Sequence, residues 1–348
     1  MGVTLKTIAE RAGVSVTTVS LVLNDRPVRV SDAVRDRVHR IADDLDYTPN
    51  LTARRLAGGR TMTVAVLINS LLNDFFCQYL RSIEACLRPK GYHLLPFESR
   101  ALPERAKQVK ALIDGGICDA LISLEDTAGS GGPKPRDGRV PVVLRQEVYG
   151  EVASPSDGVR TLRVDYGPAL RQLGAHFRDV GATRVGILAL GWNDPALPEG
   201  ERSPRADAFA RVFSDCGLFV SPSQSSGVEP GRTLRDWHDA TIALLEREPG
   251  IDCLVVHNML VMPPVLEALR AMGRAPGEDI AVATYDDSIA SEWMARGMTV
   301  IREPIDELSR LLVDLTLGEL GGGPALGDQR AQADLAVRFS SGLRSRSA

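Results

Sequence analysis

Short apolar runs alternate with amphipathic stretches from residue 64 onward. Within each run the apolar residues are consecutive, which is typical of strands that are buried on both faces of a parallel sheet. The stretches between them have helical spacing, so the pattern predicts the βαβ repeat of a doubly wound α/β fold. The expected strands are 64–68, 92–97, 119–124, 140–144, 162–165, 184–190, 252–258 and 279–287. The expected helices are 75–89, 103–114, 167–180, 204–216, 233–247 and 260–272.

Two later apolar runs, 299–303 and 335–339, would give more strands than one sheet of this kind usually needs. The pattern therefore predicts two lobes that divide near residue 160. The expected boundaries are 62–161 with 292–321 for the N-terminal lobe, 162–291 with 322–341 for the C-terminal lobe, and 342–348 for a tail.

Residues 1–46 contain no strand pattern and predict three short helices instead. The first two, 5–12 and 16–23, are joined at Gly13, where a side chain would obstruct the turn. Two short helices that are joined by a glycine turn and braced by a third form a helix-turn-helix. The expected N-cap residues are Thr4, Ser15 and Ser31, and one face of the third helix carries Val34, Val38, Ile41 and Leu45.

Length and composition exclude several classes of protein. The 348 residues are 44% hydrophobic and 25% charged, which is typical of a folded chain of more than one domain. The longest run free of polar residues is 185–192, far shorter than the ~20 residues of a membrane helix. The N-terminus lacks a basic segment followed by an apolar one, so we expect no secretory signal and a cytoplasmic location.

Five widely spaced cysteines include no Cys-x-x-Cys pair, so neither a disulfide framework nor a metal site is expected, and no cofactor motif is present. The net charge of -4 is unevenly divided. Residues 1–60 hold ten Lys and Arg against seven Asp and Glu, whereas the rest of the chain holds 31 against 38. A basic head on an acidic body favours a head that binds a polyanion.

The stretch TLKTIAERAGVSVTTVSLVLN (4–24) closely resembles the DNA-binding head of the lactose-repressor (LacI/GalR) family of bacterial transcription regulators. The resemblance continues through 30–50, the segment LTARRLAGGRT (51–61) and the core, to about Ser340. It implies a hinge at 47–61 that becomes helical on DNA, and a two-lobed core similar to periplasmic sugar-binding proteins. The implied partners are double-stranded operator DNA, a small-molecule effector and a second copy of the chain, in an effector-controlled repressor.

The second helix of the head is expected to read DNA. The first residues of a recognition helix face base edges in the major groove, so Val16, Thr17 and Thr18 are placed to contact bases. The alternative for Val16 is a place in the apolar core. At Leu21 the family usually has an arginine, and leucine can contact a thymine methyl but cannot bond guanine. The expected DNA-binding residues are Thr4, Ser15, Val16, Thr17, Thr18, Ser20, Leu21, Asn24, Asn50, Ala53, Arg54 and Leu56.

Residues 50–57 predict a short hinge helix between Pro49 and Gly58. In the family, a leucine at the position of Leu56 is pushed into the minor groove, where an apolar wedge bends the duplex. The alternative is a flexible linker with an incidental leucine. A helix of this length is unstable alone in water, so its folding is expected to be coupled to DNA binding.

The effector is expected between the lobes, at the carboxyl ends of the strands. The expected effector-binding residues are Ser70, Asn73, Phe75, Phe76, Gln146, Arg205, Asn258 and Asp286. Simple core packing is the alternative for Phe76, and a solvated helix position is the alternative for Arg205.

Three positions depart from the sugar-binding members. The family usually has an acidic residue where this chain has Ser70, Gln146 and Met259. Carboxylates are natural acceptors for sugar hydroxyls, so their loss weakens the interpretation of the ligand as a sugar. Arg205, with His257 and Arg232, instead favours a small anionic or partly apolar effector as a second possibility.

The sequence argues against two other classes of function that could use this fold. A cytoplasmic enzyme on this fold would need a phosphate-binding glycine loop or a nucleophile elbow, and neither motif is present. The neighbouring Asp286 and Asp287 would point to opposite faces of a strand and could not act as a pair. A transporter's solute-binding protein would need export. The C-terminal residues show no leucine heptads, which favours a dimer over a tetramer.

Overall fold

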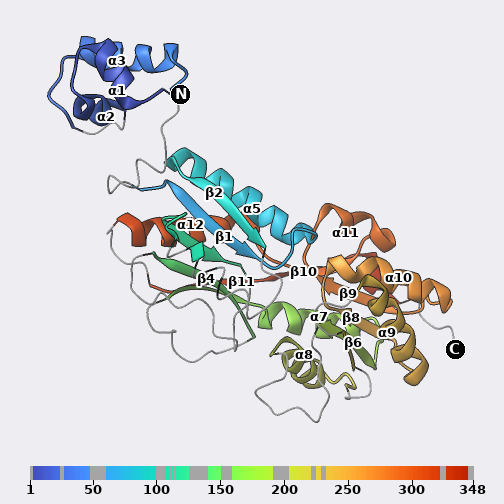
Figure 1. Cartoon of the computed structure of the whole chain (residues 1–348). Coiled ribbons are helices and arrows are strands. Elements are labelled where there is room, and N and C mark those ends of the chain that lie inside the picture. Colours follow the sequence, from blue (N-terminus) through green and yellow to red (C-terminus); the bar gives the residue numbers. More distant parts are fainter. Residues whose placement is uncertain are drawn as a thin grey trace. The chain divides into compact units, whose positions relative to one another are not determined.

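A computed structural model describes residues 3–23, 27–47, 60–98, 107–124 without 108, 110, 113 and 114, 140–149, 159–190, 204–220, 225–228, 233–321 and 327–343. The chain divides into two compact units, Met1–Thr61 and Met62–Ala348 (Figure 1). The first unit is the helical head and the second is the α/β core.

The head contains the three helices that the sequence predicts: α1 (Leu5–Ala12), α2 (Val16–Leu23) and α3 (Asp32–Asp44). The Thr4 hydroxyl accepts a hydrogen bond from the Thr7 amide at 3.3 Å, and Gly13 has a left-handed φ of 65° at the turn. Ser31 is the N-cap residue of α3, as predicted, but its side chain makes no capping hydrogen bond. The apolar core comprises Ile8, Ala9, Ala12, Val19, Val22, Val38 and Ala42.

The core unit is built on two six-stranded sheets. The first has the order β11-β5-β4-β3-β1-β2, and all its neighbours are parallel. Its strands are β1 (Thr63–Ile68), β2 (His93–Glu98), β3 (Ala120–Ser123), β4 (Val142–Val148), β5 (Arg160–Asp165) and β11 (Gln329–Gln332).

The second sheet has the order β12-β10-β9-β8-β6-β7, and β12 is its antiparallel strand. Its strands are β6 (Val185–Leu190), β7 (Ser225–Val228), β8 (Cys253–Val256), β9 (Ala281–Tyr285), β10 (Thr299–Arg302) and β12 (Asp334–Ala336). These two sheets define a first lobe and a second lobe.

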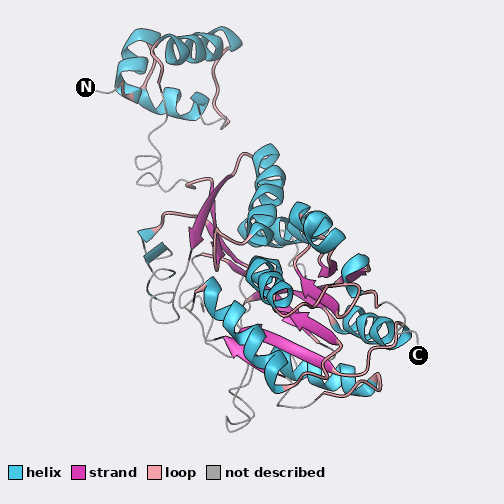
Figure 2. Ribbon diagram, turned by 90° about the vertical axis from the view of Figure 1, so that its right-hand side faces the viewer, coloured by secondary structure: helices cyan, strands magenta, loops and turns pink. Residues whose placement is uncertain are grey.

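Helices cover both faces of the sheets (Figure 2), as a doubly wound fold requires. Their bounds are α5 (Asp74–Leu87), α7 (Gly167–Asp179), α8 (Pro204–Asp215), α9 (Leu234–Arg247), α10 (Met262–Ala271), α11 (Ile289–Trp293) and α12 (Ile305–Gly321). Short 3-10 helices span Arg88–Lys90, Met259–Val261, Met294–Arg296 and Phe339–Ser341. Helices α5 and α12 pack on the first sheet, whereas α7 and α8 pack on one face of the second sheet and α9 and α10 on the other.

The strand pairings differ from the expected lobe boundaries. Strand β5 pairs with β4 and therefore belongs to the first lobe, and β10 pairs with β9 in the second. Strand β11 joins the first lobe by pairing with β5. The chain thus crosses between the lobes at about residues 166, 303 and 333. An apolar run shows that a strand is buried but not which sheet it joins, because the same pattern suits either lobe.

Strands β7 and β11 and helix α12 were not among the expected elements. Both strands lie at or next to a sheet edge and have the polar sequences SSGV and QRAQ, so they carry no apolar signal. The expected strand 279–287 is too long, since β9 ends at Tyr285 and Asp286 has a φ of 71°. None of the helices in the described part of the chain has the length and apolar character of a membrane span.

Candidate functional site

The first turn of α2 is exposed while its other face packs in the head. Val16 is 44% exposed and Thr17 is exposed, whereas Val19 and Val22 are fully buried. The core alternative for Val16 is therefore wrong. The Ser15 hydroxyl accepts a hydrogen bond from the Thr18 amide at 3.0 Å, which caps the helix. The exposed residues stand where a recognition helix contacts base edges.

The other expected DNA contacts are only partly described. Thr4 is exposed at the start of α1, and Ser20 and Leu21 are half-buried on α2. Asn24, Asn50, Ala53, Arg54 and Leu56 lie outside the described residues, so their roles stay predictions.

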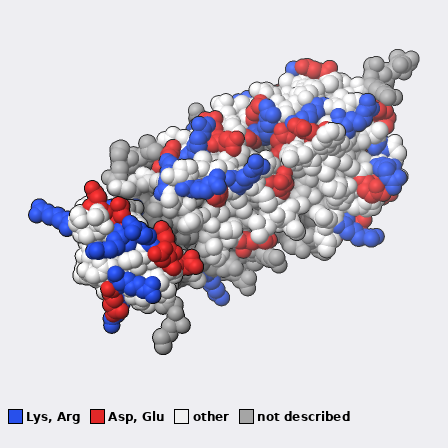
Figure 3. Space-filling model, turned by 90° about the horizontal axis from the view of Figure 1, so that it is seen from above, with Lys and Arg blue, Asp and Glu red and all other residues white. Residues whose placement is uncertain are grey.

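Charge is dispersed over the face of the molecule that Figure 3 shows. Lysine and arginine side chains alternate there with aspartate and glutamate among the described residues.

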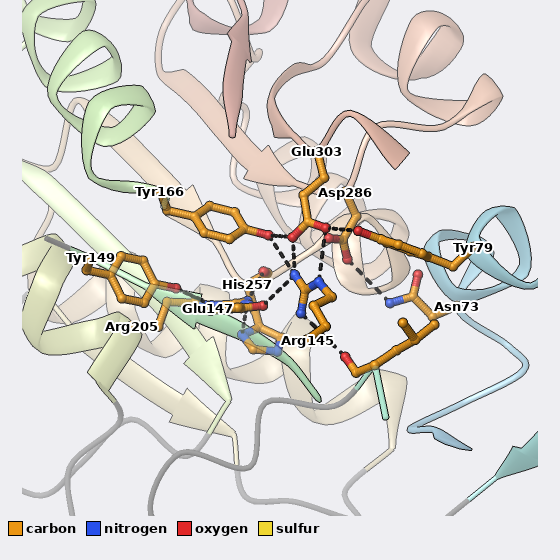
Figure 4. A network of polar contacts seen from close by, with 11 residues as sticks. Asn73, Tyr79, Arg145, Glu147, Tyr149, Tyr166, Arg205, His257, Asp286 and Glu303 are labelled. Carbon is orange, nitrogen blue, oxygen red and sulfur yellow. Dashed lines mark hydrogen bonds and ion pairs between the residues drawn. The ribbon is translucent and has the colours of Figure 1, made fainter. Parts of the chain in front are cut away.

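Two expected effector residues meet across the lobes (Figure 4). Asn73 caps α5, where its Oδ1 accepts a hydrogen bond from the Phe75 amide at 3.1 Å. Its Nδ2 donates to Asp286 Oδ2 at 3.3 Å, although the two residues lie 213 positions apart. Asp286 follows β9 of the second lobe, so this contact joins the carboxyl ends of strands from both sheets.

Asp286 is held in an environment that opposes its charge. Burial raises the pKa of its carboxyl group to about 7, against the opposing influence of the Arg205 charge and the Asn73 hydrogen bond; Glu147 and Glu303 raise it further. Its carboxylate is therefore poised to change charge near neutral pH. The neighbouring Asp287 instead pairs with Arg338 at 2.8 Å, so the two carboxylates do not form a catalytic pair.

Arg205 is not the free cation that the anionic interpretation of the effector required. It lies on α8, and its Nη2 donates to both carboxylate oxygens of Glu147 at 2.6 and 2.7 Å. Its Nε donates to the Tyr149 hydroxyl at 3.1 Å, and its Nη1 donates to the His257 carbonyl at 3.1 Å. The guanidinium carbon lies 4.7 Å from the centre of the Tyr285 ring. The alternative of a solvated helix position is also wrong.

The charges around this ion pair keep Glu147 ionised and His257 neutral. Burial alone would raise the pKa of Glu147, but the charges of Arg205 and Arg145 outweigh it and lower the pKa to about 2. Burial and the nearby Arg205 charge lower the pKa of His257 to about 3. His257 therefore adds no positive charge for an anionic ligand at neutral pH.

A second ion pair lies where the chain crosses between the lobes. Arg145 on β4 forms a bidentate contact with Glu303, which follows β10, and both side chains are almost fully buried. The Tyr79 and Tyr166 hydroxyls also donate to Glu303, so its four contacts come from α5, β4 and the first crossing. Such a network is stable only while every buried charge has its partners.

The remaining expected residues have different surroundings. Phe75 is buried, 5.4 Å from the Arg145 guanidinium, and Phe76 packs partly buried against the apolar core, which is the alternative reading of that residue. The Ser70 hydroxyl accepts a hydrogen bond from the Leu72 amide at 3.1 Å. No described group bonds the buried Oδ1 of Asn258.

Gln146 lies on β4 between Arg145 and Glu147. Side chains alternate along a strand, so Gln146 points to the opposite face of the sheet from Arg145 and Glu147. Met259 is 6% exposed and packs in the apolar core of the second lobe, and it also lines the hollow that Asn73 and Asp286 line. Arg232 lies outside the described residues.

Sequence reasoning missed most of the charged network: Arg145, Glu147, Tyr149, Tyr166, Tyr79 and Glu303. The segment RQEVY (145–149) holds a signal, because β4 continues to Val148 and places Arg145 and Glu147 on one face. Ending the expected strand at residue 144 hid that spacing. No three His, Cys, Asp or Glu side chains of the described residues lie together as metal ligands would.

Comparisons with known proteins agree with this architecture. Residues 4–50 match the bacterial regulatory proteins of the lacI family, and residues 175–341 match a periplasmic binding protein-like domain. The HTH-type transcriptional regulator CelR of Thermobifida fusca is 28% identical over 91% of this chain and 92% of its own. The ribose operon repressor of Escherichia coli is 26% identical over 94% and 96%.

The chain belongs to the lactose-repressor (LacI/GalR) family. Its fold is similar to that of the lac repressor dimer bound to operator and the anti-inducer ONPF, with a TM-score of 0.74 at 22% identity over 98% of this chain and all of that one. It is also similar to the CelR–cellobiose complex, with a TM-score of 0.65 at 25% identity over 97% and 99%. The relatives named here are transcription regulators, so this LacI/GalR member is a DNA-binding regulator and not an enzyme.

Proposed function

We propose that this LacI/GalR protein is a dimeric repressor that binds palindromic operator DNA through α2. A small molecule that binds between the lobes raises or lowers its affinity for the operator. One observation carries the proposal. The same chain joins a helix-turn-helix with an exposed recognition helix to a core whose polar side chains meet across two lobes, from Asn73 to Asp286 and from Arg205 to Glu147. We propose the cytoplasm, where operator DNA is found, as its location.

An exposed apolar patch on the core supports the dimer. Leu71 and Leu72, just before α5, are 49% and 82% exposed, and Ile289 and Trp293, on α11, are each 80% exposed. Two of the four line neighbouring hollows of the same surface: Leu72 lines one, and Ile289 lines another of about 660 Å³. Apolar side chains this exposed mark a surface that is covered by a partner. A second copy fits, because one recognition helix reads few base pairs and symmetry doubles the contact.

Effector control needs only a modest coupling. A ligand that contacts both lobes favours one degree of closure, and closure changes the separation of the two heads in a dimer. A hundredfold change in operator affinity requires ~3 kcal/mol of differential binding. Sugars are the first candidates for the ligand, since one relative is the ribose operon repressor and one similar structure is a complex of CelR with cellobiose.

Selection from a random duplex pool tests the proposal. The intact chain should enrich a palindrome, with affinity that falls steeply between low and physiological salt, whereas the core unit from Met62 onward should enrich nothing. Adding ribose, cellobiose or another sugar should then shift operator affinity. A single unrepeated half-site, or equal selection by the core unit, would contradict the proposal.

A further inference from the structure

The ionic groups of the cleft already satisfy one another. Glu147 Oε1 accepts hydrogen bonds from Arg205 and, at 3.3 Å, from Arg145, and its Oε2 accepts from Arg205 and, at 3.0 Å, from the Tyr149 hydroxyl. The Glu147 side chain is only 9% exposed. With two arginines opposite Glu147 and Glu303, the local charge is balanced before any ligand binds.

Two acceptors keep bonding capacity, as does the buried Tyr285 hydroxyl, which can donate or accept. Among the described residues, the buried Oδ1 of Asn258 has no donor, and Asp286 receives its bond on one carboxylate oxygen, from Asn73. Both residues follow neighbouring strands, β8 and β9, of the second sheet. A ligand that completes this set must bring hydrogen-bond donors, and hydroxyl groups do so without adding charge.

We propose that Glu147 is a specificity-determining residue of the effector site: as the built-in counter-ion of Arg205 it excludes anionic ligands and leaves the site to uncharged, hydroxylated ones. The inference rests on the proposed effector function of the cleft. The Glu147 carboxylate already accepts a hydrogen bond from Arg205 Nη2 at 2.6 Å, so an anion that approaches this nitrogen meets a like charge, and like charges repel strongly in a buried site. Removing that carboxylate therefore leaves the buried Arg205 guanidinium without its counter-ion, and an anion can then bind in its place.

Thermal unfolding of the intact chain, with sulfate and glucuronate as probes and sodium chloride of equal ionic strength as reference, tests the proposal. In the wild-type protein both anions should act as chloride does. In Glu147→Gln both anions should raise the Tm above its value in sodium chloride. Their affinity for this variant should be at least tenfold higher than for the wild-type protein. The double variant E147Q/R205Q should lose this gain, since the cation is gone.

The matched control is Glu248→Gln, which removes the partner of Arg184 in a more exposed pair of 3.1 Å and should create no anion response. An E147Q protein that gains nothing over chloride, or that stays unfolded even in sulfate, overturns the proposal. So does a wild-type protein that binds glucuronate as tightly as glucose or more tightly. Operator binding measured on the same preparations distinguishes a failure of this inference from a failure of the proposed function. E147Q can fail to bind anions while the wild-type protein still binds DNA.

Discussion

Asp286 is the residue whose charge state matters most near neutral pH. Its folded pKa of about 7 lies above its ordinary value of 3.8 because burial penalises the carboxylate. A raised carboxyl pKa means that the folded state binds its proton more tightly than the unfolded state. This contribution to stability is therefore present at low pH and is lost as the pH rises from about 4 through 7.

Replacing Asp286 with asparagine removes that charge while keeping an oxygen for the Asn73 amide. We expect D286N to raise the free energy of unfolding at pH 8 by at least about 1.4 kcal/mol, the equivalent of one pKa unit. At pH 5 the gain should be smaller, since the wild-type protein loses this stability between about pH 4 and 7 and has lost only part of it at pH 5. Denaturant unfolding at both pH values measures the difference, and an equal effect at pH 5 would show that charge is not the cause.

Glu303 shows how a buried ion pair depends on both partners. Changing Glu303 to glutamine leaves the Arg145 guanidinium buried without its main counter-ion. We expect this to cost ~3–5 kcal/mol, measured by denaturant unfolding. The control E319Q breaks the more exposed Arg160–Glu319 pair of 2.7 Å and should cost under ~1 kcal/mol. If both variants lose a similar free energy of unfolding, the buried Arg145–Glu303 pair depends on its partners no more than the exposed pair does.

At the scale of the element, α2 has one face that packs in the head and another that we expect to contact DNA bases. Val19 and Val22 hold the helix on the head's core, while its first turn is exposed. Leu21 lies half-buried between these faces, at a position where the family resemblance implies an arginine. The operator of this protein should therefore differ from the common family sequence at the base that residue 21 contacts.

Leu21→Arg should move the base preference toward guanine at one position of each half-site. Arginine can bond both guanine acceptors, a contact that contributes ~1–3 kcal/mol of discrimination. Selection from a random duplex pool with both proteins measures the shift. The same consensus from the wild type and the variant would show that residue 21 does not face the bases.

At the scale of the whole molecule, we expect the patch around α11 to form the dimer interface. Trp293 is 80% exposed, so Trp293→Glu removes apolar surface without disturbing the interior. We expect the variant to sediment as a monomer and to bind a palindromic operator at least tenfold more weakly than the wild type. Leu234→Glu, on α9, is the control, since Leu234 is 50% exposed on another helix. A dimeric W293E protein would place the interface elsewhere.

Local signals were enough to predict the head and most of the order of elements. The caps at Thr4 and Ser15 and the turn at Gly13 depend on residues only a few positions apart. The buried strands of the core are visible in the sequence as apolar runs. Asn73, Arg205 and Asp286 could be placed in the cleft because the family resemblance and the strand ends both pointed there. Edge strands such as β11 gave no signal, since half-exposed polar strands resemble loops.

The sequence by itself determined a helix-turn-helix joined to a doubly wound core, because caps, turns and runs of apolar residues express short-range physics. Only the tertiary structure decided which charges pair. Arg145 and Glu303 are 158 residues apart, and Arg205 and Glu147 are 58 apart, so no local pattern links them. Their pairing follows from the chain crossings that bring both sheets to one cleft, and it turned Arg205 from an expected anion ligand into a side chain that is already neutralised.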